Sequence, residues 1–309
     1  MALLRFALLA VVLLVCAAPA SASTGPCLPE RGSPRCHFWS AKTVFVADGD
    51  TIHVDVDGDG THRYRPIRIT GLNAMEMTRY SKYPSRRRGE CHSREATAAL
   101  ERLIRKAHMR VRLAAQDPAS RSGHRLRRQV SVRIHGHWVD LAERLIADGH
   151  ALWLPNADEW AWNSSYEPLA KGAQELRLNL WNPRGCGVGP ASHAGLSMRL
   201  NYDADGNDFD NVDGEWARIS NSSPLPIRLA GWWFRDSALR RYRFPRWAEI
   251  PPGGSVTLRM GKGRSAGQTF YWGLATPPLE NPSYDRRGIG DGGYLFDPKG
   301  NLRIGEIYP

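Results

Sequence analysis

The sequence predicts a mainly β protein with some α-helix, divided between a five-stranded barrel with packed helices and a β-sandwich that follows it. Three observations support this fold class. Strand-like alternation dominates residues 43–70, amphipathic helical segments follow, and beyond residue 200 short β-like runs are separated by Gly, Pro, Asn and Asp. A chain of 309 residues is long for one core and comfortable for two domains.

The first residues are typical of a cleaved secretory signal. Arg5 precedes an apolar run over residues 6–18, and small residues end at Ala22. We therefore expect a signal peptide over residues 1–22 that is cleaved near Ala22, and hence a secreted, extracellular protein. No later segment offers the roughly 20 apolar residues that a membrane-spanning helix needs, so we expect no membrane span.

Removal of this signal leaves four cysteines, and an oxidising destination favours two disulfides. Four cysteines allow three pairings. We prefer Cys27 with Cys36, because these two are close in sequence, and Cys91 with Cys186. Metal binding by the thiols is the weaker interpretation, since no Cys-x-x-Cys spacing occurs.

Positive charge is concentrated in the first half of the chain. Residues 41–188 contain 24 Lys plus Arg against 17 Asp plus Glu, whereas residues 200–309 contain 14 against 13. The first half is therefore the better candidate for binding a polyanion, because a positive surface attracts phosphate backbones. Maintenance of solubility is an equally good explanation of this charge.

The first domain begins with a predicted three-stranded meander. Residues 43–46 and 51–56 alternate as strands do, and residues 65–70 follow a glycine-rich turn. This turn imitates the start of an EF-hand loop, but Pro66 stands where a bidentate Glu is required. We therefore interpret it as a hairpin turn.

Three helices are predicted, over residues 93–107, 140–147 and 166–180, with Ser93 as the N-cap of the first. A strand pair over residues 109–139 separates the first helix from the second. A five-stranded barrel of the oligonucleotide-binding (OB) type with packed helices accounts for this order.

Polar side chains near the strand ends suggest chemistry on phosphate. If Asp48 and Asp50 lie on a strand, both point to one face, so Asp50 can reach a metal ion while Asp48 supports it. Asn73 offers an amide oxygen, which suits calcium together with carboxylates and water. Arg68 can donate two hydrogen bonds to a phosphate, and Glu76 is placed to act as a general base.

At this point residues 41–186 resemble the staphylococcal nuclease-like (thermonuclease) family. The matching stretches, in order, are VADGDTI (46–52), IRITGLNAME (67–76), GECHSREAT (89–97), HRLRRQVSV (124–132), LIADGHA (145–151) and LNLW (178–181). The resemblance implies a barrel that hydrolyses phosphodiester bonds of DNA and RNA with Ca²⁺ and leaves a 3′-phosphate.

The resemblance also assigns metal ligands. Asp50 becomes a calcium ligand, Asn73 takes the place of a second ligand that is often aspartate, and Ala74 contributes its backbone carbonyl. Asn73 lacks the charge of an aspartate, which should weaken calcium binding. Met75 replaces the proline that is usual in the family, so the turn that presents Glu76 is less rigid.

Catalytic roles follow from the same resemblance. Arg68 becomes the first phosphate-binding arginine, Glu76 activates water, and Arg125 is the match for the second arginine. Arg127 lies on the same strand face and is the alternative, also as a substrate-binding residue. We expect Glu76→Gln or Arg68→Ala to lower the chemical rate strongly while leaving the fold intact.

Two further features are candidates for contact with a nucleic-acid strand. Trp153 can stack on a base, although a core position is at least as good an explanation. The basic run at residues 86–88, together with Lys82, lies just after the site and can follow a phosphate backbone; a solvated loop is the simpler explanation.

The last part of the chain resembles the lamin-tail domain, an immunoglobulin-like β-sandwich. The matching stretches include NVDGEWARISN (211–221), LAGW (229–232) and GKG (261–263). No catalytic set is evident there, so we expect a role in adhesion or targeting, with the target unknown.

These inferences divide the chain into five parts: a signal peptide (1–22), an N-terminal segment that contains Cys27 and Cys36 (23–40), a staphylococcal nuclease-like domain (41–188), a linker (189–199) and a lamin-tail-like domain (200–309). The function we expect is that of a secreted calcium-dependent nuclease. The alternatives are a noncatalytic extracellular nucleic-acid-binding protein and a cell-envelope adhesion protein.

Overall fold

The computed structural model describes residues 22–77, 89–186, 195–238, 240–281 and 287–309. The expected signal peptide lies outside these residues except for Ala22. Lys82 and the basic run at residues 86–88 also lie outside them, as does most of the expected linker. Within the described ranges, no helix has the length and apolar character needed to cross a membrane.

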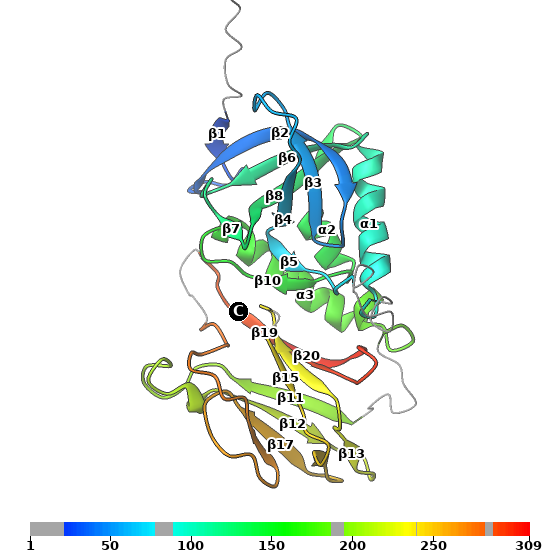
Figure 1. Ribbon diagram of the computed structural model, residues 1–309, viewed down its shortest axis with the longest axis vertical. Coiled ribbons are helices and arrows are strands. Elements are labelled where there is room, and N and C mark those ends of the chain that lie inside the picture. The colour runs from blue at the N-terminus through cyan, green and yellow to red at the C-terminus, as the bar shows by residue number, and fades with distance from the viewer. Residues whose placement is uncertain (1–21, 78–88, 187–194, 239, 282–286) are drawn as a thin grey trace, which may run out of the picture.

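A closed five-stranded barrel forms the core of the first domain (Figure 1). The strands are β2 (Arg35–Val46), β3 (Thr51–Val56), β4 (Arg65–Ile69), β8 (Arg125–Ile134) and β6 (Arg110–Ala115), in that order around the barrel. Pairing of β2 with β6 closes the sheet. Ile52, Val54 and Ile67 are fully buried and help to fill the interior. The predicted OB-type barrel is thereby confirmed.

The first domain has three helices, α1 (Ser93–Lys106), α2 (Leu141–Ala147) and α3 (Asn163–Glu175). Helices α1 and α2 pack on the barrel strands, and α3 packs on α2. The third begins and ends earlier than the sequence predicts. The N-cap of α1 is His92, in the left-handed region at φ 72°, and not Ser93, which is already helical and makes no capping bond. Asp140 caps α2 by accepting hydrogen bonds from two backbone amides.

Short elements complete this domain. They are β1 (Ser23–Pro26), β5 (Gly71–Asn73), β7 (Arg121–Ser122), β9 (His137–Asp140), β10 (Leu152–Leu154) and two 3₁₀ turns (Trp160–Trp162 and Asn179–Trp181). Among the strands that the structure describes, β5 pairs with β10 alone, outside the barrel. This separate pairing is important because β5 carries Asn73 at its end.

Two disulfides link Cys27 to Cys36 and Cys91 to Cys186, which confirms the preferred pairing. The first ties β1 to β2 at the N-terminal hairpin. The second joins the start of α1 to the end of the domain, 95 residues later in the chain. Two disulfides of this kind suggest an oxidising environment.

The second domain is an immunoglobulin-like sandwich of two four-stranded sheets. One sheet contains β11 (Leu196–Asn201), β12 (Trp216–Asn221), β17 (Ser255–Arg259) and β18 (Thr269–Tyr271). The other contains β15 (Arg241–Arg243), β14 (Trp233–Asp236), β19 (Asp291–Phe296) and β20 (Leu302–Tyr308). A short pair, β13 (Ile227–Arg228) with β16 (Glu249–Ile250), and a 3₁₀ turn (Val212–Gly214) lie beside them. Phe234, Leu258 and Leu295 are fully buried between the sheets.

The sheet that contains β19 and β20 faces the barrel domain (Figure 1). Tyr294, Phe296 and Ile307 of this sheet belong to the same hydrophobic cluster as the barrel core. A hydrogen bond of 2.6 Å from Gln174 Nε2 of α3 to the Gly305 carbonyl crosses the same boundary. The two domains therefore share buried apolar surface, and the barrel site described below lies at their junction.

Asp140 supplies a test of how the helices are held on the barrel. Its side chain accepts hydrogen bonds from the amides of Ala142 and Glu143 at 2.9 and 3.3 Å and from the Tyr166 hydroxyl at 2.5 Å. Asp140→Ala removes a helix cap and leaves a buried hydroxyl without its acceptor, so we expect a loss of about 2–4 kcal/mol in the free energy of unfolding.

The measurement is urea denaturation, and Asp140→Asn is the matched control because its amide oxygen still caps the helix. We expect the control to cost less than about 1 kcal/mol. Equal stability of the Ala variant and the wild type would contradict this role.

Candidate active site

Strand register gathers the candidate residues at one end of the barrel. Thr51 of β3 lies opposite Arg68 of β4, and Arg68 lies beside Arg127 of the parallel strand β8. Arg125 is two residues from Arg127 and so shares its strand face. Three arginines from two neighbouring strands therefore come together although two of them are more than 50 residues from the third.

Asp48 and Asp50 lie in the bend between β2 and β3, not on a strand as the sequence analysis supposed. The bend is packed tightly, because a Cβ atom at Gly49 would approach the Cβ atoms of Ala74 and Ala96 to 2.6 and 2.9 Å. Asp48 Oδ1 accepts a hydrogen bond from the Asp50 N–H at 3.1 Å. The small residue and this bond direct Asp50 inward, where it is 4% exposed.

Both oxygens of Asp50 have protein partners. Oδ1 accepts a hydrogen bond from Thr51 Oγ1 at 2.8 Å and forms an ion pair with Arg68 Nη1. Oδ2 accepts a hydrogen bond from the backbone N–H of Ala74 at 3.1 Å. Ala74 thus contacts Asp50 through its amide, whereas the family resemblance assigns a role to its carbonyl.

Arg68 is buried and bridges several segments. Its Nη2 donates to Asn73 Oδ1 at 3.0 Å and to the Leu72 carbonyl at 3.2 Å, while Nη1 meets Asp50. Burial, followed by the nearby charge of Arg125, lowers the pKa of Arg68 to about 10. The guanidinium therefore remains charged at neutral pH and occupies the space between the Asp50 and Asn73 oxygens.

Asn73 is fully buried and uses both ends of its amide. Its Oδ1 accepts from Arg68, and its Nδ2 donates to the Ser237 carbonyl of the second domain at 3.0 Å. An aspartate has no donor for that carbonyl. The departure from the family pattern thus has a structural reason that the sequence alone does not reveal: the amide joins the barrel to the sandwich.

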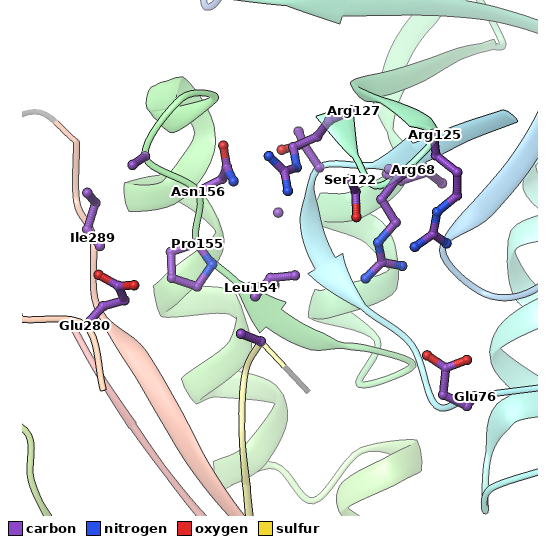
Figure 2. Close-up of a pocket in the computed structure, with 15 residues that line it drawn as sticks. Arg68, Glu76, Ser122, Arg125, Arg127, Leu154, Pro155, Asn156, Glu280 and Ile289 are labelled. Carbon is purple, nitrogen blue, oxygen red and sulfur yellow. The ribbon is translucent and has the colours of Figure 1, made fainter. Parts of the chain in front are cut away.

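Glu76 lies at the rim of the site, and its exposed side chain points towards Arg68 and Arg125 (Figure 2). Partial desolvation, followed by the charges of Asp48 and Glu90, raises the pKa of the Glu76 carboxyl above its ordinary value. A carboxylate with a raised pKa is a better proton acceptor at neutral pH.

Arg125 and Arg127 both reach the site. Arg125 Nη1 donates to Thr51 Oγ1 at 2.9 Å, and Arg127 Nη1 lies 4.0 Å from Asp158 Oδ2. Burial lowers the pKa of Arg127, and the charge of Asp158 opposes this effect. The geometry brings both arginines to one pocket, so the choice between them as the second phosphate-binding arginine stays open.

A pocket with a volume of about 370 Å³ lies in front of these side chains (Figure 2). Its barrel wall contains all three arginines and Glu76. The end of β10 contributes Leu154, and the segment that follows contributes Pro155 and Asn156. Guanidinium groups and a carboxylate on one wall suit a phosphate and a water molecule that must lose a proton.

The second domain forms the opposite wall with Ala238, Glu280 and Ile289 (Figure 2). Sequence reasoning missed these residues, because none belongs to a motif of the barrel and only contact between domains brings them to the pocket. Glu280 on this wall lies across the cavity from the arginines, so both walls carry charged side chains.

Trp153 does not take the base-stacking role considered for it. Its side chain is 0% exposed and packs in the hydrophobic cluster of the barrel domain. Neither face of the indole is accessible to a nucleotide. The short run Leu152–Leu154 gives no period from which the sequence could have distinguished a core position from a surface one.

Oxygen atoms of the kind that a hard cation such as calcium prefers are present at the site, and two of them belong to the side chains of Asp50 and Asn73. The Asp50 carboxylate and the Asn73 amide oxygen both contact the Arg68 guanidinium, so a cation between them would require Arg68 to move away. Among the described residues no group of three or more His, Cys, Asp and Glu side chains is suited to hold a metal ion. The remaining oxygens would be backbone, water or substrate.

Comparison with protein families matches the Lamin Tail Domain to residues 199–307. This match supports the lamin-tail resemblance of residues 200–309 and agrees with the observed sandwich. No match was found among curated proteins. For residues 41–188 the barrel is OB-like, and the resemblance to the nuclease family rests on the motifs of the sequence.

The buried pair of Asp50 and Arg68 changes one expectation from the sequence. Arg68→Ala leaves the Asp50 carboxylate buried and without its counter-charge, so this variant should not leave the fold intact. We expect a loss of about 3–5 kcal/mol in the free energy of unfolding, measured by urea denaturation. The control Arg125→Ala removes a pocket arginine from a less buried position and should cost less than about 1 kcal/mol. An Arg68→Ala variant as stable as the wild type would contradict the pairing.

Asn73→Asp tests the double role of this amide. An aspartate keeps the acceptor for Arg68 but places a carboxylate oxygen against the Ser237 carbonyl. In chelator we expect the free energy of unfolding to fall by about 1–3 kcal/mol. Calcium should raise the melting temperature of the variant more than that of the wild type, because a charged ligand binds the ion better. Unchanged stability in chelator is the contrary result.

Proposed function

We propose that the chain is a secreted, calcium-dependent nuclease that hydrolyses phosphodiester bonds of DNA, with RNA as a further candidate substrate. The observation that supports this proposal most is the pocket, in which three arginines and Glu76 line one wall next to the buried oxygens of Asp50 and Asn73. A phosphodiester needs positive groups for its charged oxygens and a base for the attacking water, and this wall offers both.

In the proposed reaction the arginines bind the scissile phosphate. Arg68 exchanges its contact with Asp50 for one with a phosphate oxygen, and Arg125 or Arg127 takes a second oxygen. Guanidinium groups make paired, charge-assisted hydrogen bonds to phosphate and stabilise the charge that grows on the equatorial oxygens in the transition state.

Asp50, the amide oxygen of Asn73 and the backbone at Ala74 are the groups that would hold the cation. A bound calcium ion would neutralise phosphate charge and act as a Lewis acid on a phosphoryl oxygen. When no cation is bound, the ion pair with Arg68 balances the buried charge of Asp50. Once Arg68 contacts the phosphate, the Asp50 carboxylate would be available to the cation.

Glu76 takes the proton of the attacking water. The oxygen of this water forms a bond to phosphorus while the bond from phosphorus to the 5′ oxygen breaks in line. The products are a 3′-phosphate and a 5′-hydroxyl, whose proton comes from solvent. The raised pKa of Glu76 supports its role as the base.

A noncatalytic nucleic-acid-binding protein is the second candidate, and one observation favours it. Arg68 is already satisfied by Asp50, Asn73 and a backbone carbonyl, an arrangement that a purely structural residue would also adopt. The presence of Glu76 and of two further arginines in the same pocket supports the enzyme instead, because binding alone does not need a base.

Digestion of plasmid DNA by the full chain separates the candidates. With calcium we expect cleavage, and with chelator none; a noncatalytic binder would retard intact DNA, and an adhesion protein would do neither. Glu76→Gln is the matched variant, since it preserves shape and removes only the base, and its rate should fall about 10²–10⁴-fold. Near-normal turnover of Glu76→Gln would defeat the assignment of the base.

A further inference from the structure

Glu90 lies next to Glu76 and forms hydrogen bonds with both the N–H and the carbonyl of its backbone. The Glu76 N–H donates to Glu90 Oε2 at 3.1 Å, and the Glu90 N–H donates to the Glu76 carbonyl at 2.9 Å. Gly89, at φ +77°, allows this close approach, because a Cβ atom there would lie 3.3 Å from the Glu76 carbonyl oxygen and 2.5 Å from Ser93 Oγ. The position of Glu76 is therefore linked to that of Glu90.

Two arginines of the second domain hold the Glu90 carboxylate. Arg235 Nη1 lies 3.4 Å from Oε2, the oxygen that also accepts from Glu76, and Arg241 Nη2 contacts Oε1. The Glu90 side chain is only 15% exposed, so these ion pairs are partly shielded from solvent. Glu90 thus connects the lamin-tail domain with the backbone of Glu76.

The two arginines are direct cross-strand partners in the pairing of β14 with β15. Like charges at such positions repel each other and destabilise a sheet. The Glu90 carboxylate supplies the anion that offsets this repulsion. The sandwich therefore carries a preformed site for one carboxylate, and the barrel fills it with the residue that holds Glu76.

Aromatic rings fix both guanidinium groups on the side of the sandwich. Arg235 lies over Phe296 at 5.5 Å from the ring centroid, and Arg241 lies over Trp233 at 4.5 Å. Arg235 is 1% exposed, and its Nε and Nη2 have no hydrogen-bond partner within the described part of the chain. A buried guanidinium that lacks other acceptors depends strongly on Glu90.

We propose that Arg235 and Arg241 are positioning residues for the reaction: acting through Glu90, they fix the backbone of Glu76 so that its carboxylate faces the pocket arginines. This inference rests on the proposed nuclease activity. It assigns to the lamin-tail domain a part in completing the active site, beyond any attachment to a target.

The contacts of Glu90 with Glu76, Arg235 and Arg241, here called the clamp, also compensate for the less rigid turn before Glu76. Met75 stands immediately before Glu76 and cannot restrict the backbone as a proline would. Contacts from outside the barrel then have to supply the rigidity that catalysis requires, since a displacement of about 1 Å in a catalytic group costs on the order of 10²-fold in rate. Glu90 and its two arginines supply such contacts.

Arg241 is the best position for a test, because its side chain is 36% exposed and its replacement should leave the fold intact. Amide hydrogen exchange at Glu76, measured by NMR on the full chain, reports the clamp without any need for activity. We expect exchange about tenfold faster in Arg241→Ala, with a similar effect in Glu90→Gln, which retains an oxygen for the Glu76 amide but loses the charge between the arginines.

Kinetics then connect the clamp with the reaction. In Arg241→Ala we expect kcat to fall about tenfold with little change in KM, because a positioning residue acts on the chemical step and not on binding. Arg241→Lys keeps the charge and should restore both exchange and kcat. Arg243→Ala, on the same strand but outside the clamp, should match the wild type in both measurements.

Exchange at Glu76 that is the same in Arg241→Ala and in the wild type overturns the inference, whatever the activity. A loss of kcat that Arg243→Ala reproduces, or that Arg241→Lys fails to restore, overturns it as well. Failure of the wild type to cleave DNA with calcium overturns the proposed function, and the exchange data then decide separately whether the second domain fixes Glu76.

Discussion

Compensation of one buried carboxylate, Asp50, constrains the rest of the site. The bend between β2 and β3 drives this group into the barrel end, where it needs a positive partner, and Arg68 on the next strand provides it. The same guanidinium then orders the end of β5, because Asn73 and the Leu72 carbonyl are its remaining acceptors. The oxygens of Asp50 and Asn73 and the guanidinium proposed to bind phosphate are thus brought together by one pairing.

The second domain extends this constraint. The Asn73 amide that receives Arg68 also donates to the Ser237 carbonyl, so the barrel end and the sandwich are joined through the site itself. Further along the chain, Glu90 makes a second connection, with two arginines of the sandwich. The same contacts therefore dock the two domains and order the pocket. The shared hydrophobic cluster stabilises both.

Local sequence patterns were sufficient to predict much of the fold. Alternation over residues 51–56 predicted β3 because its inward side chains are apolar, and the short spacing of Cys27 and Cys36 favoured their disulfide, which the structure contains. The motifs singled out Arg68, Glu76 and Arg125, which line one pocket. They gave Asp50 and Arg68 separate ligands, however, whereas the two side chains form an ion pair with each other. That pairing depends on burial, which a motif does not encode.

Contacts between distant residues were beyond sequence reasoning for a physical reason. Asn73 and Ser237 are 164 residues apart, and neither belongs to a periodic pattern that points to the other. The burial of Trp153 likewise follows from packing and not from its neighbours in the chain. Long-range contacts of this kind decide which polar group is a ligand and which is a structural support.

The most direct test of the central claim is a crystal structure of the full chain with calcium and a non-hydrolysable dinucleotide. We expect Arg68 to leave Asp50 for the phosphate and oxygens of Asp50 and Asn73 to lie about 2.3–2.6 Å from the ion. A structure in which calcium and nucleotide are bound elsewhere, with Arg68 still paired to Asp50, would contradict it.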